Sequence, residues 1–224
     1  AAVDAVGNAA AWAGPPVRLR AAGLEAPRYL KLDAEGRASL EIPVPDAGIY
    51  RVEVEALGAR FVSNPLVVHE EVVPQRWADL QVHSGASDGT GALDDLYRYA
   101  RDVAGLDAVA ITDHDHFGMR FLDRDVAGWV AQQDAAARWN APGRFVTFAA
   151  YEWTSWLYGH RHVLYVGEPG PVWGSLDLPT RTPAGLWAAL APFDAITIPH
   201  HVAGGPVALD ARYIGEAKVE PVVE

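Results

Sequence analysis

Residues 79–91 read DLQVHSGASDGTG, and this stretch decides how the rest of the chain is interpreted. It begins as an alternating, strand-like run and then ends in His83, Ser84 and Asp88 among several glycines. Because positions two apart on a strand point the same way, Gln81 and His83 share one face. Polar groups at the end of a strand in this arrangement are typical of a binding or catalytic site.

Downstream of this stretch, strand patterns and helix patterns alternate. We expect strands at 77–84, 106–114, 144–153, 160–167 and 194–201, and helices at 92–105, 120–139 and 182–191. Alternating strands and helices indicate parallel strands joined by crossover helices, either in an open sheet or in a barrel.

The first 72 residues show a different rhythm. Apolar and polar residues alternate between turn residues in three short segments, at 37–45, 48–57 and 59–68. This pattern predicts a small all-β sandwich. The segment 69–77 is charged, contains Pro74 and breaks the alternation, which is typical of a linker. We therefore expect two domains, at residues 1–72 and 73–224.

The composition excludes several classes of function. The chain has 224 residues, about half of them hydrophobic, which suffices for one large or two small cores. Its formal net charge of −11 and the absence of a Lys/Arg cluster argue against a nucleic-acid surface. The absence of cysteine excludes disulfides and thiol nucleophiles. No apolar run is long enough for a membrane helix, and we expect a soluble protein, either cytoplasmic or exported.

The histidines are distributed unevenly. Seven of the eight follow residue 82, and each of their four groups falls at or inside a predicted strand: His83; His114 and His116; His160 and His162; His200 and His201. In parallel α/β architectures the carboxyl ends of the strands converge on one crevice. Residues far apart in the sequence are therefore expected to meet there.

Each group also has an ordinary explanation. His83 alone can be a hydrogen-bonded structural histidine, and residues 113–116 can be a polar loop. Glu152, which ends the hydrophobic run 146–151, can pair with an arginine. The histidines at 160–162 can lie on an exposed strand face, and those at 200–201 can cap a loop. Together, however, the groups indicate a metal site.

The ligand types narrow the choice of metal. Imidazoles and carboxylates without a thiolate suit Zn²⁺, Mn²⁺ or Fe²⁺, and a carboxylate such as Glu152 or Asp88 can bridge two ions. The candidates outnumber the four ligands of a single tetrahedral zinc. We therefore expect two or three divalent ions.

The ordered motifs DLQVHSGASDGT (79–90), ITDHD (111–115), a strand-terminal glutamate, HRHV (160–163) and a Pro-His strand end resemble the PHP (polymerase and histidinol phosphatase) superfamily of metal-dependent phosphoesterases. The resemblance covers about residues 77–224. With the preceding β-domain, the chain looks closest to a bacterial PHP-like family of unassigned function that carries an immunoglobulin-like N-terminal domain.

This resemblance implies an α/β fold, a distorted (β/α)7 barrel with a metal site at the carboxyl ends of its strands. Carried over residue by residue, it implies these metal ligands: His83, Asp88, His114, bridging Glu152, either His160 or His162, and His200. The spacing from Glu152 favours His162, whereas the His-Arg pair favours His160.

Two departures from the family pattern are visible. The first motif normally reads His-x-His, but Gln81 occupies the first place, and an amide oxygen is a weaker, neutral ligand. The closing Asp-x-His motif is absent, since the sequence stops at Glu224. We therefore expect the chain to be a fragment whose barrel continues downstream.

The leading functional hypothesis is a hydrolase that attacks a phosphomonoester or phosphodiester, its small phosphorylated substrate, with a metal-bridging hydroxide. Four residues are candidates for catalysis or substrate contact: Asp115, His116, Arg161 and His201. The alternative is a catalytically degenerate PHP-like binding protein that captures a ligand or partner with its metal-site remnant and with aromatic residues, Trp153, Trp156 and Trp173. The sequence does not indicate an oligomeric state.

Overall fold

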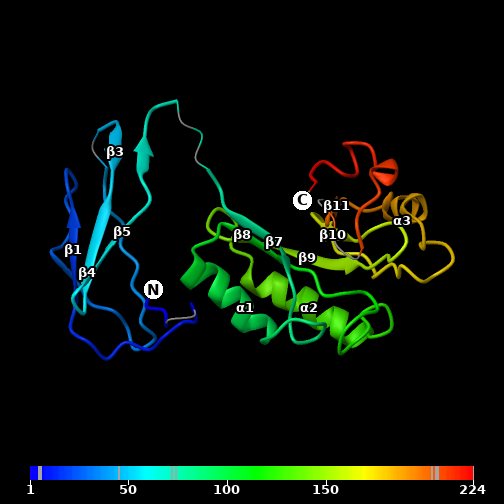
Figure 1. Cartoon of the computed structure of the whole chain (residues 1–224), viewed down its shortest axis with the longest axis horizontal. Coiled ribbons are helices and arrows are strands. Elements are labelled where there is room, and N and C mark those ends of the chain that lie inside the picture. The colour runs from blue at the N-terminus through cyan, green and yellow to red at the C-terminus, as the bar shows by residue number, and fades with distance from the viewer. Residues whose placement is uncertain are drawn as a thin grey trace. The chain divides into compact units, whose positions relative to one another are not determined.

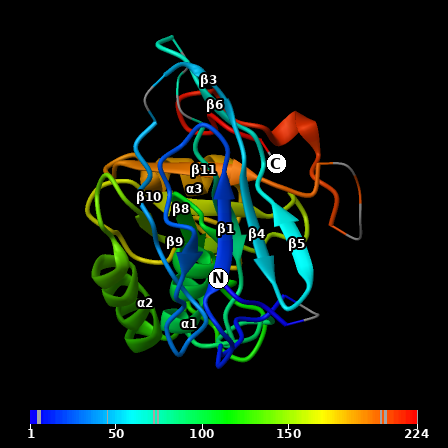
Figure 2. The ribbon, with the colours of Figure 1, turned by 90° about the vertical axis from the view of Figure 1, so that its left-hand side faces the viewer.

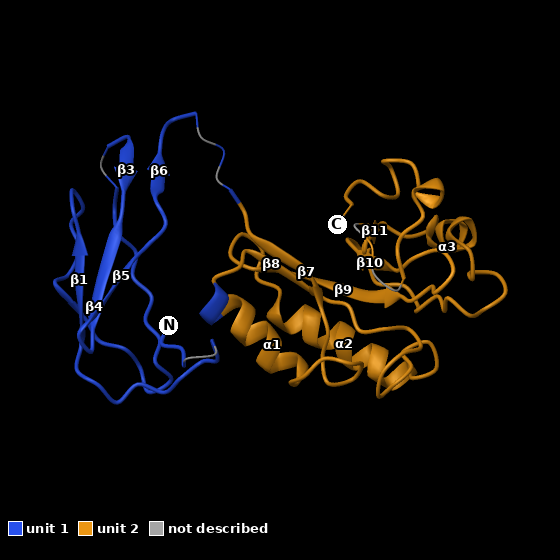
Figure 3. Cartoon of the chain, viewed as in Figure 1, with its two compact units in different colours: residues 1–75, 102–104 blue, residues 76–101, 105–224 orange. Residues whose placement is uncertain are grey.

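The computed structural model describes residues 1–4, 7–44, 46–71, 73, 75–202, 204 and 207–223 (Figure 1). The chain divides into two compact units (Figure 3): unit 1 contains residues 1–75 and 102–104, and unit 2 contains residues 76–101 and 105–224. The predicted domain boundary, between residues 72 and 73, lies close to this division. Residue 72 itself and Pro74 of the predicted linker lie outside the described residues.

Unit 1 contains antiparallel strands. A four-stranded sheet has the order β2-β1-β4-β5, and Figure 2 labels β1, β4 and β5 of this sheet. A two-stranded sheet pairs β3 with β6. The strands are β1 (Val17–Ala21), β2 (Tyr29–Leu30), β3 (Gly48–Tyr50), β4 (Val52–Ala56), β5 (Ala59–Val62) and β6 (Leu66–Val68). The strands expected at 48–57 and 59–68 are confirmed, each in two pieces. The strand expected at 37–45 is wrong for the described residues 37–44, which form none.

Unit 2 contains one five-stranded sheet of order β11-β10-β9-β8-β7. Its strands are β7 (Ala78–Val82), β8 (Ala108–Ile111), β9 (Val146–Trp153), β10 (Arg161–Tyr165) and β11 (Ala195–Pro199). Its α-helices are α1 (Leu93–Tyr99), α2 (Val126–Trp139) and α3 (Pro183–Leu190), so each strand and helix expected downstream of residue 77 is present. Strands β7, β8 and β9 run parallel, and the crossover helices α1 and α2 lie on one face of the sheet (Figure 1).

The expected (β/α)7 barrel is wrong. Strand β10 pairs antiparallel with both β9 and β11, and in the described part of the chain the sheet has only five strands, with β7 and β11 at its edges. The link between β9 and β10, residues 154–160, is too short for the crossover that two parallel neighbours require. The architecture is a mixed α/β sheet of three parallel strands continued by two antiparallel pairings.

The reversal of β10 determines where its histidines lie. Arg161, the first residue of β10, pairs with Trp153 at the end of β9 and with Pro199 at the end of β11. The beginning of β10 therefore lies at the end of the sheet where the other four strands have their carboxyl ends. His160 and His162 therefore lie at the same end of the sheet as the residues that follow β7, β8 and β11.

The core of unit 2 forms where the apolar sheet faces meet the helices. One buried cluster joins Tyr97 of α1, Ile111 of β8 and Ala135 of α2. Helix α1 continues as a π-helical turn over Ala100–Ala104 and ends at Gly105, whose φ of 69° is in the left-handed region that favours glycine. None of the helices described in the structure combines the length and the apolar character that crossing a membrane requires.

Asp94 connects the two crossover helices. Its carboxylate accepts hydrogen bonds from the Trp139 indole (2.6 Å) and from Arg138 (3.0 Å), both at the end of α2. We expect Asp94→Ala to lower the free energy of unfolding at pH 7 by about 1 kcal/mol, because Asp94 is half exposed. Urea unfolding measures the change. Asp95→Ala, which removes only an exposed pair with Arg98, should have a smaller effect.

The stabilisation by Asp94 should depend on pH. The hydrogen bond from Trp139, followed by that from Arg138, lowers the pKa of Asp94. A carboxyl group with a lowered folded-state pKa contributes stability above its unfolded pKa of about 3.9 and loses that contribution as pH falls through the folded value. The difference between wild type and Asp94→Ala should therefore shrink as the pH falls below about 3.9. An unchanged difference there would contradict this role.

Candidate metal centre

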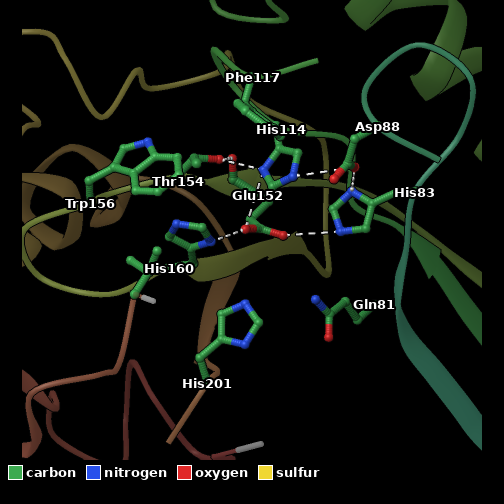
Figure 4. A pocket seen from close by; sticks show the side chains of 11 residues that line it. Gln81, His83, Asp88, His114, Phe117, Glu152, Thr154, Trp156, His160 and His201 are labelled. Carbon is green, nitrogen blue, oxygen red and sulfur yellow. Dashed lines mark hydrogen bonds and ion pairs between the residues drawn. The ribbon is translucent and has the colours of Figure 1, made fainter. Parts of the chain in front are cut away.

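Glu152, near the end of β9, lies at the centre of a ring of histidines (Figure 4). Its side chain is 1% exposed, and a ring nitrogen of each of five histidines lies within 2.6–3.6 Å of a carboxylate oxygen. The distances are 3.2 Å for His83, 3.3 Å for His114, 2.6 Å for His160, 3.6 Å for His162 and 3.4 Å for His200.

All five strands of unit 2 contribute to this ring. His83 follows β7, His114 follows β8 and forms a parallel bridge with Glu152, and His200 follows β11. His162 lies in β10 directly opposite Glu152 in the antiparallel register. His160 precedes β10 by one residue and points to the same side as His162, because the two are separated by one position.

The ligand atoms form three overlapping groups in the described part of the chain. The groups are His83, His114 and Glu152; Glu152, His162 and His200; and His160, His200 and His201. In each, the candidate atoms lie within 4.8 Å of one another. Glu152 has two oxygens and can serve both of its groups at once. Each of the three groups could therefore hold a metal ion.

The polar atoms of this centre have few hydrogen bonds. Among the described residues, the carboxylate oxygens of Glu152 and the ring nitrogens of His160 and His200 have no well-directed hydrogen bond. Nearly all buried polar atoms in folded proteins have a partner. A bound cation would satisfy carboxylate oxygens and imidazole nitrogens that lie close together without well-directed hydrogen bonds.

The pKa values of Glu152, His162 and His201 favour cation binding, whereas Glu152 outweighs burial and raises the pKa of His83. Burial alone would raise the pKa of Glu152, but the surrounding imidazoles, His114 foremost, outweigh burial and lower it. Burial lowers the pKa of His162 to about 4, despite the attraction of Glu152, and burial together with His200 lowers that of His201. Near pH 7 the carboxylate is therefore charged, and these two imidazoles are neutral with a lone pair to offer.

Thr154 orients His114. The Thr154 hydroxyl lies 2.7 Å from Nδ1 of His114 and donates its hydrogen to the backbone oxygen of Glu152 at 3.1 Å. A hydroxyl has one hydrogen, so Thr154 must accept from Nδ1–H of His114. That assignment leaves Nε2 of His114 with the lone pair, 3.4 Å from Oδ1 of Asp88.

The turn that follows His83 is held by buried Asp113. This carboxylate accepts hydrogen bonds from the amide (2.7 Å) and hydroxyl (2.6 Å) of Ser84 and from the hydroxyl of Ser87 (2.5 Å). Gly89 allows the turn to close, because a Cβ there would lie 1.9 Å from the backbone oxygen of His83. The serines and glycines of the opening stretch thus place His83 and Asp88 at the pocket.

The structure brings most of the predicted ligands together. These are His83, Asp88, His114, Glu152, His160, His162 and His200. Both of the alternatives at 160 and 162 contact the carboxylate. Gln81 lines the pocket but belongs to none of the three groups found among the described residues. His201, expected only as an accessory residue, is a member of the third group and has a left-handed φ of 62°.

The three predicted catalytic residues lie elsewhere. Arg161 is fully buried and donates to Glu220 at 2.7 Å and to backbone oxygens, because it points to the opposite side of β10 from the histidines. Asp115 accepts hydrogen bonds from the amides of Thr154 (3.1 Å) and Ser175 (2.6 Å) and from Nδ1 of His116 (2.8 Å). Asp115 and His116 therefore support the loops around the pocket and are absent from its described lining.

Sequence reasoning missed the residues that position the ligands. Thr154, Ser87 and Asp113 have ordinary polar side chains, and their roles depend on contacts between strands that the sequence does not show. Ser84 and Asp113 stand in the motifs at 79–90 and 111–115, and this position is the sequence signal that could have identified them.

Replacing Thr154 by valine tests the orientation of His114. Valine keeps the shape but cannot accept the Nδ1 hydrogen, so we expect divalent-metal affinity to fall about 10- to 100-fold. Thr154→Ser retains the hydroxyl and is the matched control. Metal titration by calorimetry measures both. Equal affinities for the valine and serine variants would contradict the assignment.

The fold and site define a mixed α/β protein with a histidine-rich candidate metal centre. A family model described as "Protein of unknown function (DUF3604)" matches residues 71–203, which is more than half of the chain. The chain therefore belongs to this family. The match includes every residue of the five-histidine ring. No curated protein and no solved structure matches the chain.

Proposed function

We propose that the protein is a metal-dependent hydrolase that cleaves a phosphomonoester or phosphodiester. The observation that carries the proposal is the buried Glu152 carboxylate with five imidazoles around it, at 2.6–3.6 Å. Imidazoles and a shared carboxylate are the ligand set of centres that hold two or three Zn²⁺, Mn²⁺ or Fe²⁺ ions. The ordered motifs that resemble the PHP superfamily support the same function.

The arrangement of the pocket would let bound ions act on a phosphate ester. The first two groups, which share Glu152, would hold a pair of ions, and His160 with His201 would serve a third position. Bound ions would supply Lewis-acid activation of water and of the ester. None of the described side chains that line the pocket is a lysine or arginine. Neutralisation of a phosphate there would therefore depend on the ions.

Two side chains at the pocket are available for the substrate. Gln81 lines the pocket outside the three groups, so its amide can donate a hydrogen bond to a phosphate oxygen. Asp88 is half exposed, with its Oδ1 atom 3.6 Å from His83 and 3.4 Å from His114. Its carboxylate can complete a metal position or accept a proton at the pocket mouth.

A second candidate function is a metal-binding protein without catalysis. Gln81 favours it, since the resemblance implies histidine at this position and the amide joins none of the three groups. The two candidates agree on metal binding and differ on turnover.

The experiment combines metal analysis with an ester panel on the full chain. We expect at least two divalent ions per chain and hydrolysis of aryl phosphate monoesters or diesters. His114→Ala should abolish turnover, and Gln81→His should raise metal occupancy. Hydrolysis that survives His114→Ala would place the chemistry elsewhere. Bound metal without turnover would favour the binding protein, and fewer than one ion per chain would overturn both functions.

A further inference from the structure

Two exposed aromatic side chains form part of the pocket wall. Phe117 is 41% exposed and Trp156 is 58% exposed, and both line the pocket that contains Glu152. Their rings pack edge to face with centroids 6.1 Å apart. In Figure 4 both rings lie beside the imidazoles, near His114 and His160.

Their contacts separate these two residues from the other exposed apolar side chains. The Phe117 ring meets His114 edge to face at 5.1 Å, and the Trp156 ring meets His160 in the same way at 5.8 Å. The aromatic wall is therefore continuous with the candidate metal ligands. Trp153, by contrast, is fully buried and donates its indole hydrogen to the backbone of Thr180, so it serves the core.

The wall has the properties of a subsite for an apolar planar group. Small-molecule sites typically combine aromatic lining with a few polar groups that fix orientation. Here the polar groups are the imidazoles and carboxylates, and the aromatic pair stands next to them. The chain carries a net charge of −11, and the described pocket lining has no lysine or arginine that would pair with a second anionic group.

We propose that the substrate is a phosphate ester of an uncharged aromatic alcohol, and that Trp156 and Phe117 bind its aromatic ring. The proposal rests on the proposed function, because the phosphate is assigned to the metal centre. Trp156 and Phe117 are specificity residues in this arrangement. They select the organic part of the ester and do not act on the reacting atoms.

Phosphonates test the subsite without hydrolysis. Calorimetry on the metal-loaded full chain would compare phenylphosphonate with methylphosphonate, which share the charged group and differ in the ring. We expect phenylphosphonate to bind about tenfold more tightly. Trp156→Ala and Phe117→Ala should each reduce this preference, which is the ratio of the two affinities measured on the same metal-loaded variant. Leu157→Ala is the control, since Leu157 is exposed beside Trp156 but is not in the described pocket lining.

The outcomes separate this inference from the proposed function. Equal binding of the two phosphonates by wild type, no binding of either, or a preference that survives both alanine substitutions would overturn the aromatic subsite. Hydrolysis of esters could still be observed in those cases. Conversely, a preference that disappears in Trp156→Ala, in a protein that hydrolyses no ester, would support the subsite and overturn the hydrolase.

Discussion

Replacing Glu152 by glutamine is expected to reduce bound metal to less than one ion per chain and to lower ester turnover by at least about a thousandfold. The carboxylate is the ligand that two of the three groups share. A neutral amide cannot bridge two cations in its place, so both positions lose their common anionic ligand. Metal analysis of the purified variant and initial rates on an aryl phosphate measure the two effects.

The Glu152→Gln variant should still fold. Glutamine has nearly the shape of glutamate, so the substitution opens no cavity, although it removes the charge that the surrounding imidazoles stabilise. We expect the metal-free variant to unfold cooperatively, at a melting temperature below that of the metal-free wild type. Glu168→Gln, on the exposed segment after β10, is the matched control and should retain metal. Two ions retained in Glu152→Gln would rule out the shared carboxylate.

Arg161→Met is expected to lower the free energy of unfolding by about 3–5 kcal/mol, because it leaves the buried carboxylate of Glu220 without its cationic partner. Both side chains are fully buried, and Nε of Arg161 lies 2.7 Å from Oε1 of Glu220. Burial lowers the pKa of the guanidinium even in the presence of this partner, which reflects the cost of desolvation. Urea unfolding of the metal-free proteins measures the loss.

Two further variants test the cause of this loss of stability. The double replacement Arg161→Met with Glu220→Leu removes both buried charges and should recover most of the stability. Arg212→Ala removes an exposed arginine that pairs with Asp210 and should leave the unfolding transition unchanged. Unchanged stability in Arg161→Met, together with a raised KM for phosphate esters, would return Arg161 to the substrate-binding role that the sequence indicated.

The sequence predicted the elements of unit 2 better than their directions. Each strand from β7 to β11 falls within an expected segment, because hydrophobic periodicity follows directly from burial. Periodicity carries no information about direction. The alternation of strands and helices predicted parallel strands, and the resemblance to the PHP superfamily implied the (β/α)7 barrel. The signal against it was available: only the short segment 154–160 separates β9 from β10, and a parallel neighbour needs a longer crossover.

The candidate ligands were predictable for a related reason. Buried strands that end in histidine or carboxylate are unusual, and they converge wherever strand ends share a sheet edge. The predicted convergence of the ligands does not require a barrel, because the reversed β10 begins at the end of the sheet where the other strands finish. The two-residue strand period also explains why Arg161 points away from His160 and His162. The parts played by Thr154 and Asp113 depend on hydrogen bonds between strands and needed the structure.

The reversed strand also affects the order in which the centre assembles during folding. A hairpin closes a short loop at low entropic cost, whereas the parallel pairings of β7, β8 and β9 must close much longer ones. Glu152, Thr154, His160 and His162 all lie within this hairpin and its loop. Three of the candidate ligands, Glu152, His160 and His162, are thus encoded in one local piece of the polypeptide, and we expect the long-range contacts to add the others later.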